Sequence, residues 1–129
     1  MSYILGVDGG NSKTLAVVAY QNGKILGVGR AGCGNHQALG VDGAMREIRR
    51  AAETALSMAE IEPSRVEAAY YCIAGADLPS DFKLLRPALE ELTLARQIDL
   101  NNDSIATLRA GTDNPNAVAV VLGAGTVAV

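Results

Sequence analysis

The sequence predicts an α/β domain built on a mixed five-stranded sheet, in which a three-stranded antiparallel meander comes first and helices then alternate with further strands. Two observations support this class. The first 30 residues hold apolar, β-branched runs that are separated by turn-forming residues. After residue 40, apolar positions recur at three- and four-residue steps, and these stretches alternate with short apolar runs.

The meander is predicted from three short runs and the turns between them. Residues Tyr3–Val7 are apolar and lead into Asp8–Gly10, as expected for a buried strand that enters a tight turn. Thr14–Tyr20 is apolar and β-branched, which predicts a second strand. Asn22-Gly23 is a strong hairpin signal, and it joins this strand to a third at Lys24–Arg30.

A long amphipathic helix is expected next, with Asp42 as its N-cap and Pro63 marking its end. Later strands that join the sheet through right-handed crossovers run parallel to it, which gives a ribonuclease H-like arrangement. These strands are expected at Val66–Ile73, Gln97–Leu100 and Ala117–Leu122, and the helices between them at Ser80–Leu92 and Ser104–Ala110.

Composition is that of an ordinary globular domain, with 49% apolar and 19% charged residues among 129. The formal net charge of -3 argues against nucleic acid or an anionic membrane as a partner. Cys33 and Cys72 are the only cysteines, and their separation fits neither a disulfide framework nor a zinc site. Reduced thiols and the absence of a signal peptide at the first residues lead us to expect a cytoplasmic protein.

The segment Asp8–Thr14, DGGNSKT, is the most informative stretch for function. Adjacent glycines let backbone N–H groups approach an anion, and Ser12, Lys13 and Thr14 add two hydroxyls and a cation suited to phosphate oxygens. Asp8 ends a strand and could hold Mg²⁺, chiefly through water. The alternative is a plain hairpin turn, because the segment lacks the Walker GxxxxGK[ST] pattern.

Other polar residues follow predicted strands and have two readings each. Asp103 could accept a proton from a substrate hydroxyl, but Asn102 or Asp103 is also a good N-cap for the next helix. His36, the single histidine, and Asp77 lie in loops, where they could bind a ligand or be ordinary exposed or capping residues. A second glycine-rich turn, Gly123–Thr126, follows the last apolar strand.

Taken together, these motifs resemble the BadF/BadG/BcrA/BcrD ATPase family, which includes N-acetylglucosamine kinases and belongs to the actin-like ATPases. That family has DGGGTKT where this chain has DGGNSKT at Asp8–Thr14, and its AG-x-D segment resembles Ala74–Asp77. Its ND pair resembles Asn102-Asp103, its second phosphate loop GTGS resembles Gly123–Thr126, and the Asn-His pair of its N-acetylglucosamine kinases resembles Asn35-His36.

The resemblance implies an ATP- and Mg²⁺-dependent sugar kinase. It implies Asp103 as the catalytic base and Asp8 as the residue that holds Mg²⁺ through water, because Mg²⁺ keeps several of its water ligands. The implied sugar contacts are Asn35, His36, Asp77 and Asp103, and the implied ATP contacts are Gly9, Gly10, Asn11, Ser12, Lys13, Thr14, Gly123, Gly125 and Thr126.

Three departures from the family pattern bear on substrate and activity. Asn11 stands where the family has a glycine, and Ala124 stands where its second loop has a threonine, so one hydroxyl is lost. Leu122 replaces a small or polar residue of the amino-sugar kinases.

The resemblance also implies two similar lobes with ATP between them. Residues 1–112 are expected to form the first lobe and residues 113–129 only the start of the second, so the chain alone should not phosphorylate a sugar. The apolar segment Ala117–Val129 is expected to fold back or to pair between copies, which favours a homodimer. The alternatives are an ATPase that activates a 2-hydroxyacyl-CoA dehydratase or benzoyl-CoA reductase, and a non-catalytic nucleotide-binding module.

Overall fold

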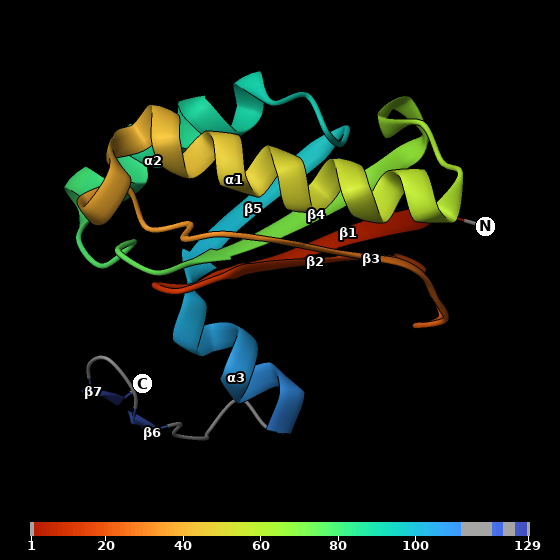
Figure 1. Ribbon diagram of the computed structural model, residues 1–129. Helices are drawn as coiled ribbons and strands as arrows, with labels where there is room; N and C mark the ends of the chain where they lie inside the picture. The colour runs from red at the N-terminus through yellow and green to blue at the C-terminus, as the bar shows by residue number, and fades with distance from the viewer. Residues whose placement is uncertain (1, 112–119, 123–125, 129) are drawn as a thin grey trace.

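The computed structural model describes residues 2–111, 120–122 and 126–128, and it confirms the predicted mixed sheet. The order of the five strands is β3-β2-β1-β4-β5, with β1, β2 and β3 antiparallel and β4 and β5 parallel to β1 (Figure 1). The strands are β1 (Tyr3–Gly9), β2 (Thr14–Tyr20), β3 (Ile25–Ala31), β4 (Val66–Ile73) and β5 (Gln97–Asn102).

Helices cover the two faces of the sheet unequally. The helices are α1 (His36–Ala59), α2 (Pro79–Glu91) and α3 (Asp103–Gly111), and a 3-10 turn, η1 (Pro63–Arg65), precedes β4. Figure 1 shows α1 and α2 together on one face and α3 alone on the other, below the ends of the central strands. The main core lies under α1 and α2, where Ile48, Tyr71 and Leu85 are fully buried.

Small residues let α1 lie very close to β3. A Cβ built on Gly29 would lie 1.8 Å from the Ala51 carbonyl oxygen, and one built on Gly27 would lie 2.1 Å from the Ala55 carbonyl oxygen. Only glycine fits at these two places, because the atoms that it meets are helix backbone. The apolar stripe predicted for this helix is thus confirmed as the core-facing side of α1.

The structure corrects the predicted start of the long helix. Asn35, not Asp42, is the N-cap of α1, and its side-chain oxygen accepts a hydrogen bond from the Gln37 N–H at 2.9 Å. Gly40, with a φ of 74° and a ψ of 168°, then interrupts the helical backbone. The apolar periodicity reads clearly only after this kink, which is why the first turn of α1 looked like a loop.

The predicted start of α2 is also corrected. The helix begins at Pro79, and the carboxylate of Asp81 accepts hydrogen bonds from the N–H groups of Leu78 at 2.9 Å and Asp77 at 3.3 Å. The N–H groups that precede the helix are therefore bonded by an acidic residue inside its first turn, where a negative charge also suits the helix dipole.

The C-terminal strands form a separate pair, with β6 (Val120–Leu122) antiparallel to β7 (Thr126–Ala128). A strand that ends at Leu122 is confirmed, but the prediction that it joins the main sheet in parallel is wrong, because β6 and β7 form a sheet of their own. Residues 117–119 lie outside the described part of the chain. The division into lobes at residue 112 remains a prediction. Among the described residues, no helix combines the length and apolar character needed to cross a membrane.

Candidate functional site

The turn between β1 and β2 is the predicted phosphate loop. The Gly10 N–H donates to the Lys13 carbonyl at 2.8 Å, closing a tight turn on which Ser12 and Lys13 are exposed. Thr14 is fully buried, and its Oγ1 donates to the Gly32 carbonyl at 2.8 Å. Ser12 and Lys13 can therefore reach a ligand from this turn, whereas the Thr14 hydroxyl holds the turn to the segment after β3.

Two further loops meet the end of β1, and we call residues 9–13, 32–36 and 74–77 together the loop junction. The Gly34 N–H donates to the Gly10 carbonyl at 2.9 Å, and the Ala74 N–H donates to the Gly9 carbonyl at 2.7 Å. A Cβ on Gly34 would lie 2.9 Å from the Gly9 Cα, so a side chain there would force the two segments apart. The glycines thus bring three predicted motifs into contact.

Asn35 lies inside the loop junction, where its side chain has two partners. Its Oδ1 accepts from the Gln37 N–H, and its Nδ2 donates to the Asn11 Oδ1 at 2.6 Å. The residue is 8% exposed. The predicted sugar contact is thus near the phosphate loop, but its amide is already engaged in internal hydrogen bonds.

His36 is buried at the start of α1, which differs from the exposed position that is usual for a loop histidine. Its Nε2 lies 3.2 Å from the Asp81 Oδ1, which favours the tautomer with the proton on Nε2. In this tautomer the buried Nδ1 carries no proton and could accept a hydrogen bond. No group among the described residues donates to it. The N–H groups of Leu78 and Asp77, together with His36, hold the pKa of Asp81 below its usual value.

In the pair Asn102-Asp103, the structure shows which residue is the cap, and the catalytic role of Asp103 stays a prediction. Asn102 is the cap, because its Oδ1 accepts from the Ser104 N–H at 3.1 Å and the Ser104 Oγ at 2.5 Å. Its Nδ2 donates to the Asp77 Oδ1 at 2.7 Å. Asp103 is the first residue of α3. Burial raises the pKa of Asp103, N–H groups of Ser104 and Asp103 partly offset this, and the negative charge of Asp77 raises it further.

Asp8 and Asp103 are close enough for their charges to interact. Burial raises the pKa of Asp8, the negative charge of Asp103 adds to this, and Lys13 opposes it. Carboxylates that repel one another and are partly desolvated gain from a nearby cation, and their hard oxygen atoms suit Mg²⁺. The residues present therefore fit a Mg²⁺ held by Asp8, although the described residues contain no group of three or more metal-ligating side chains.

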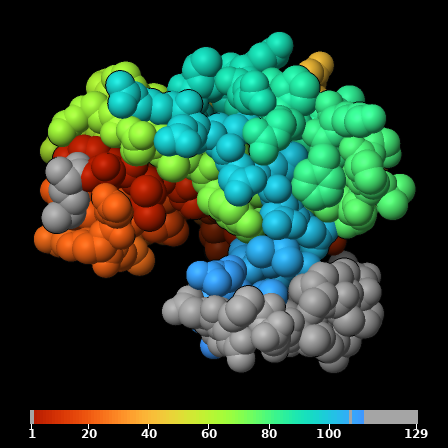
Figure 2. Space-filling model, turned by 180° about the vertical axis from the view of Figure 1, so that it is seen from behind, coloured from red at the N-terminus to blue at the C-terminus, as the bar shows by residue number. Residues whose placement is uncertain are grey.

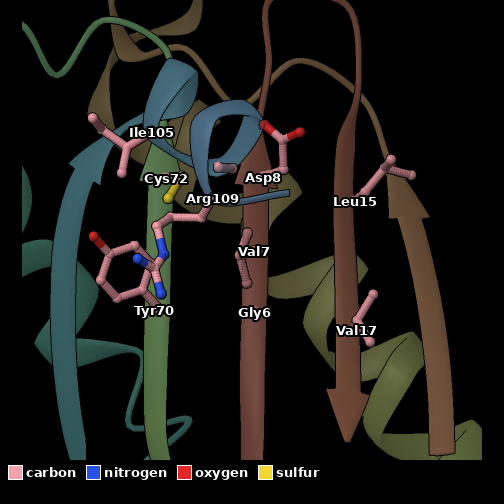
Figure 3. Close-up of a pocket in the computed structure, with 10 residues that line it drawn as sticks. Gly6, Val7, Asp8, Leu15, Val17, Tyr70, Cys72, Ile105 and Arg109 are labelled. Atoms are coloured by element: carbon pink, nitrogen blue, oxygen red, sulfur yellow. The ribbon is translucent and has the colours of Figure 1, made fainter. Parts of the chain in front are cut away.

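A groove of about 590 Å³ runs from Asp8 along the α3 face of the sheet. Figure 3 shows Asp8 at the end of β1 beside α3, with Cys72 and Tyr70 on β4 and Leu15 and Val17 on β2 to either side. Seen from behind, this face is hollowed between the orange β2–β3 region and the blue α3 (Figure 2). Its lining is mainly apolar, and Asp8 is its only carboxylate among the described residues.

The second glycine-rich turn is only partly described. Gly123 and Gly125, predicted to contact phosphate, lie outside the described residues, as does Ala124. Thr126 opens β7, and its backbone alone is described. Phosphate binding by this second turn therefore stays a prediction.

Sequence reasoning missed the side chains that organise the loop junction. Asp81 had a signal, since an acidic residue shortly after Pro79 is typical of a helix start. The bond between Asn11 and Asn35 had none, because it joins residues 24 positions apart in the chain. Gly75 adopts a positive φ of 88°, and a Cβ on it would lie 2.4 Å from the Asn35 Oδ1.

A family model, the BadF/BadG/BcrA/BcrD ATPase family, matches residues 5–129. The chain belongs to this family. No curated protein sequence matches it. As a BadF/BadG/BcrA/BcrD ATPase family member, the chain carries its Asp8–Thr14 turn, its Asn102-Asp103 pair and its two further loops at one end of the sheet.

Solved structures share the fold. A protein provisionally named N-acetylglucosamine kinase from Porphyromonas gingivalis is 25% identical with a TM-score of 0.71, and the match covers 99% of this chain and 43% of that one. A similarly named protein from Chromobacterium violaceum is 19% identical with a TM-score of 0.70, covering 99% and 44%. YeaZ from Pseudomonas aeruginosa is 14% identical with a TM-score of 0.51, covering 96% and 56%.

These matches place the chain in the actin-like, ribonuclease H-like fold. The chain spans less than half the length of the two proteins named as kinases. Family membership implies a nucleotide as ligand, with a divalent metal as its usual companion.

Proposed function

We propose that this chain is the first lobe of an ATP-dependent sugar kinase whose acceptor is N-acetylglucosamine or a related amino sugar. The observation that carries the proposal is that Asn102 makes the cap of α3. Because Asn102 caps α3, Asp103 is available at the carboxyl end of β5, near Asp8 and the phosphate loop. Ligand sites of α/β sheets lie at such strand ends.

Phosphoryl transfer depends mainly on positioning and on neutralising charge. In the proposed reaction, Lys13 and the N–H groups of the glycine-rich turn contact the phosphates. Mg²⁺, when bound near Asp8, would neutralise phosphate charge. Asp103 accepts the proton of the acceptor hydroxyl, and its raised pKa makes its carboxylate a stronger base. Asn35, His36 and Asp77 orient the sugar from the loop junction and the adjoining strand end.

The matches to two proteins named as N-acetylglucosamine kinases support a sugar acceptor over the dehydratase-activator alternative. An activator of that kind holds an iron–sulfur cluster through cysteine thiolates. Cys72 is 3% exposed and burial raises its thiol pKa to about 12, which disfavours the thiolate. Iron content of the intact protein distinguishes the two functions. Nucleotide binding without sugar-dependent turnover would instead indicate a non-catalytic module.

The test is Asp103→Asn in the intact protein that contains this chain. We expect kcat for sugar-dependent ADP release from ATP to fall by roughly 10²–10⁴-fold, as for loss of a general base. The Kd for ATP should stay within about threefold, since less than 0.7 kcal/mol of binding would be lost. Asp42→Asn, an exposed aspartate on α1, is the matched control.

Full activity of Asp103→Asn would show that Asp103 is not the general base and that its role is structural. A wild-type protein whose ADP release does not respond to N-acetylglucosamine or related amino sugars would refute the kinase assignment itself.

A further inference from the structure

The hydrogen bond between Asn11 and Asn35 joins the proposed phosphate loop to the proposed sugar contacts. The Asn35 Nδ2 donates to the Asn11 Oδ1 at 2.6 Å, a bond between two side chains, and bonds from the Thr14 Oγ1 to Gly32 and from the Gly34 N–H to Gly10 join the same segments through backbone carbonyls. We propose that Asn11 is a positioning residue that couples the two sites, so that nucleotide and acceptor each strengthen the binding of the other. This inference rests on the proposed function.

The Oδ1 of the Asn35 amide is anchored by its surroundings. Its Oδ1 caps α1 by accepting from the Gln37 N–H, and Gly75 packs so closely that a Cβ there would lie 2.4 Å from that oxygen. A flipped amide would break the cap and would place an N–H group beside Gly75. The bond to Asn11 then fixes the direction of its Nδ2, and the second N–H of this group remains for a ligand hydroxyl.

Asn11 moves with the phosphate loop, because it lies at the exposed tip of the turn that Gly10 and Lys13 close. A phosphate that orders this turn fixes the Asn11 Oδ1 as well. Asn35 is then fixed before a sugar arrives, and the sugar binds without the full entropy cost of ordering it. A glycine at position 11, as in the family's loop, has no side chain with which to make this link.

The size of the coupling is bounded by the bond that carries it. A neutral hydrogen bond at a partly exposed position contributes a factor of roughly 2 to 12 to an equilibrium constant. Linkage makes this factor the same for either ligand. We therefore expect Mg·AMPPNP to tighten N-acetylglucosamine binding about 2- to 12-fold, and the sugar to tighten Mg·AMPPNP binding equally.

The experiment is calorimetry on the intact protein, with the Kd of N-acetylglucosamine measured with and without saturating Mg·AMPPNP. The ratio of the two Kd values is the readout, because substitutions in the loop can also change each affinity separately. In Asn11→Ala the ratio should fall to about 1, since the linking bond is gone.

The control is Asn22→Ala, which removes an asparagine from the β2–β3 turn at the opposite end of the sheet. It should keep the wild-type ratio. A wild-type ratio of 1, or an Asn11→Ala variant that retains the wild-type ratio, would overturn the coupling and leave the kinase assignment standing. Failure of the wild-type protein to bind either ligand would overturn both.

Discussion

The two faces of the sheet differ in how closely the chain packs on them. On the α1 and α2 face, alanine, leucine and isoleucine side chains are fully buried, and β3 touches the backbone of α1 at Gly29. On the α3 face, Val28 and Tyr70 are 44% and 39% exposed, and a groove opens beside Asp8. The α1 and α2 face therefore stabilises the fold through close packing. The α3 face leaves space at the strand ends, where the proposed chemistry takes place.

The largest expected effect on stability comes from adding one methyl group to the closely packed face of the sheet. Gly29→Ala places a Cβ 1.8 Å from the Ala51 carbonyl oxygen, so it should lower the free energy of unfolding by about 3 kcal/mol or more. Gly6→Ala is the control, because a Cβ there meets no described atom within 4 Å. Its effect should stay within about 0.5 kcal/mol. Urea unfolding measures the free energy of unfolding of both variants. Equal losses in the two variants would contradict the difference in packing between the two faces of the sheet.

The second prediction concerns association between copies. The apolar segment Ala117–Val129 is proposed to pair between chains, so this chain should sediment as a homodimer or larger species. A chain that ends near Thr112 should sediment as a monomer. Monomers in both cases, with equal solubility, would refute the proposed pairing.

Two carboxylates should show opposite dependence of stability on pH. The pKa of Asp81 is lowered by N–H groups of Leu78 and Asp77, so its ionised form adds stability above its unfolded pKa, and this is lost as pH falls through the folded pKa. The pKa of Asp8 is raised by burial and by Asp103, so its ionisation removes stability as pH rises through the unfolded pKa towards the folded one.

Asp81→Asn should therefore lower Tm by a few °C at pH 7, and Asp8→Asn should raise it by about 1–3 °C. The Asp8 difference should shrink at about pH 3, where that carboxyl group is largely protonated, and the Asp81 difference should shrink as the pH falls through the lowered folded pKa of Asp81. Thermal unfolding across this range is the measurement. Shifts of the same sign at pH 7 would show that the environments of the two groups have been misassigned.

The smallest expected effect is that of Tyr71→Phe in the closed core. The Tyr71 hydroxyl is buried and has no hydrogen-bond partner among the described residues, and desolvation raises its pKa. Removing an unsatisfied hydroxyl should leave stability unchanged or raise it by up to about 1 kcal/mol. A loss greater than this in denaturant unfolding would indicate a partner for the hydroxyl, such as a bound water.

Local sequence signals determined the elements and their order. Periodicity separated the strands from the helices, Asn22-Gly23 marked the hairpin, and the meander followed by alternation predicted the mixed sheet. These signals depend on residues near one another in the chain, so they can be read without knowing the fold. The start of α1 was misjudged because Gly40 interrupts the pattern and the cap is made by Asn35 before it.

The arrangement at the strand ends required the tertiary structure. The Asp8–Thr14 motif and the Asn102-Asp103 pair were recognisable as sequence, but which member of the pair caps α3 depends on where Asn102 points. The contact of Asn11 with Asn35 and of His36 with Asp81 joins residues from separate loops. Sequence encodes local backbone preference directly, whereas such contacts exist only once the sheet has brought distant loops together, and for that reason only the fold decided them.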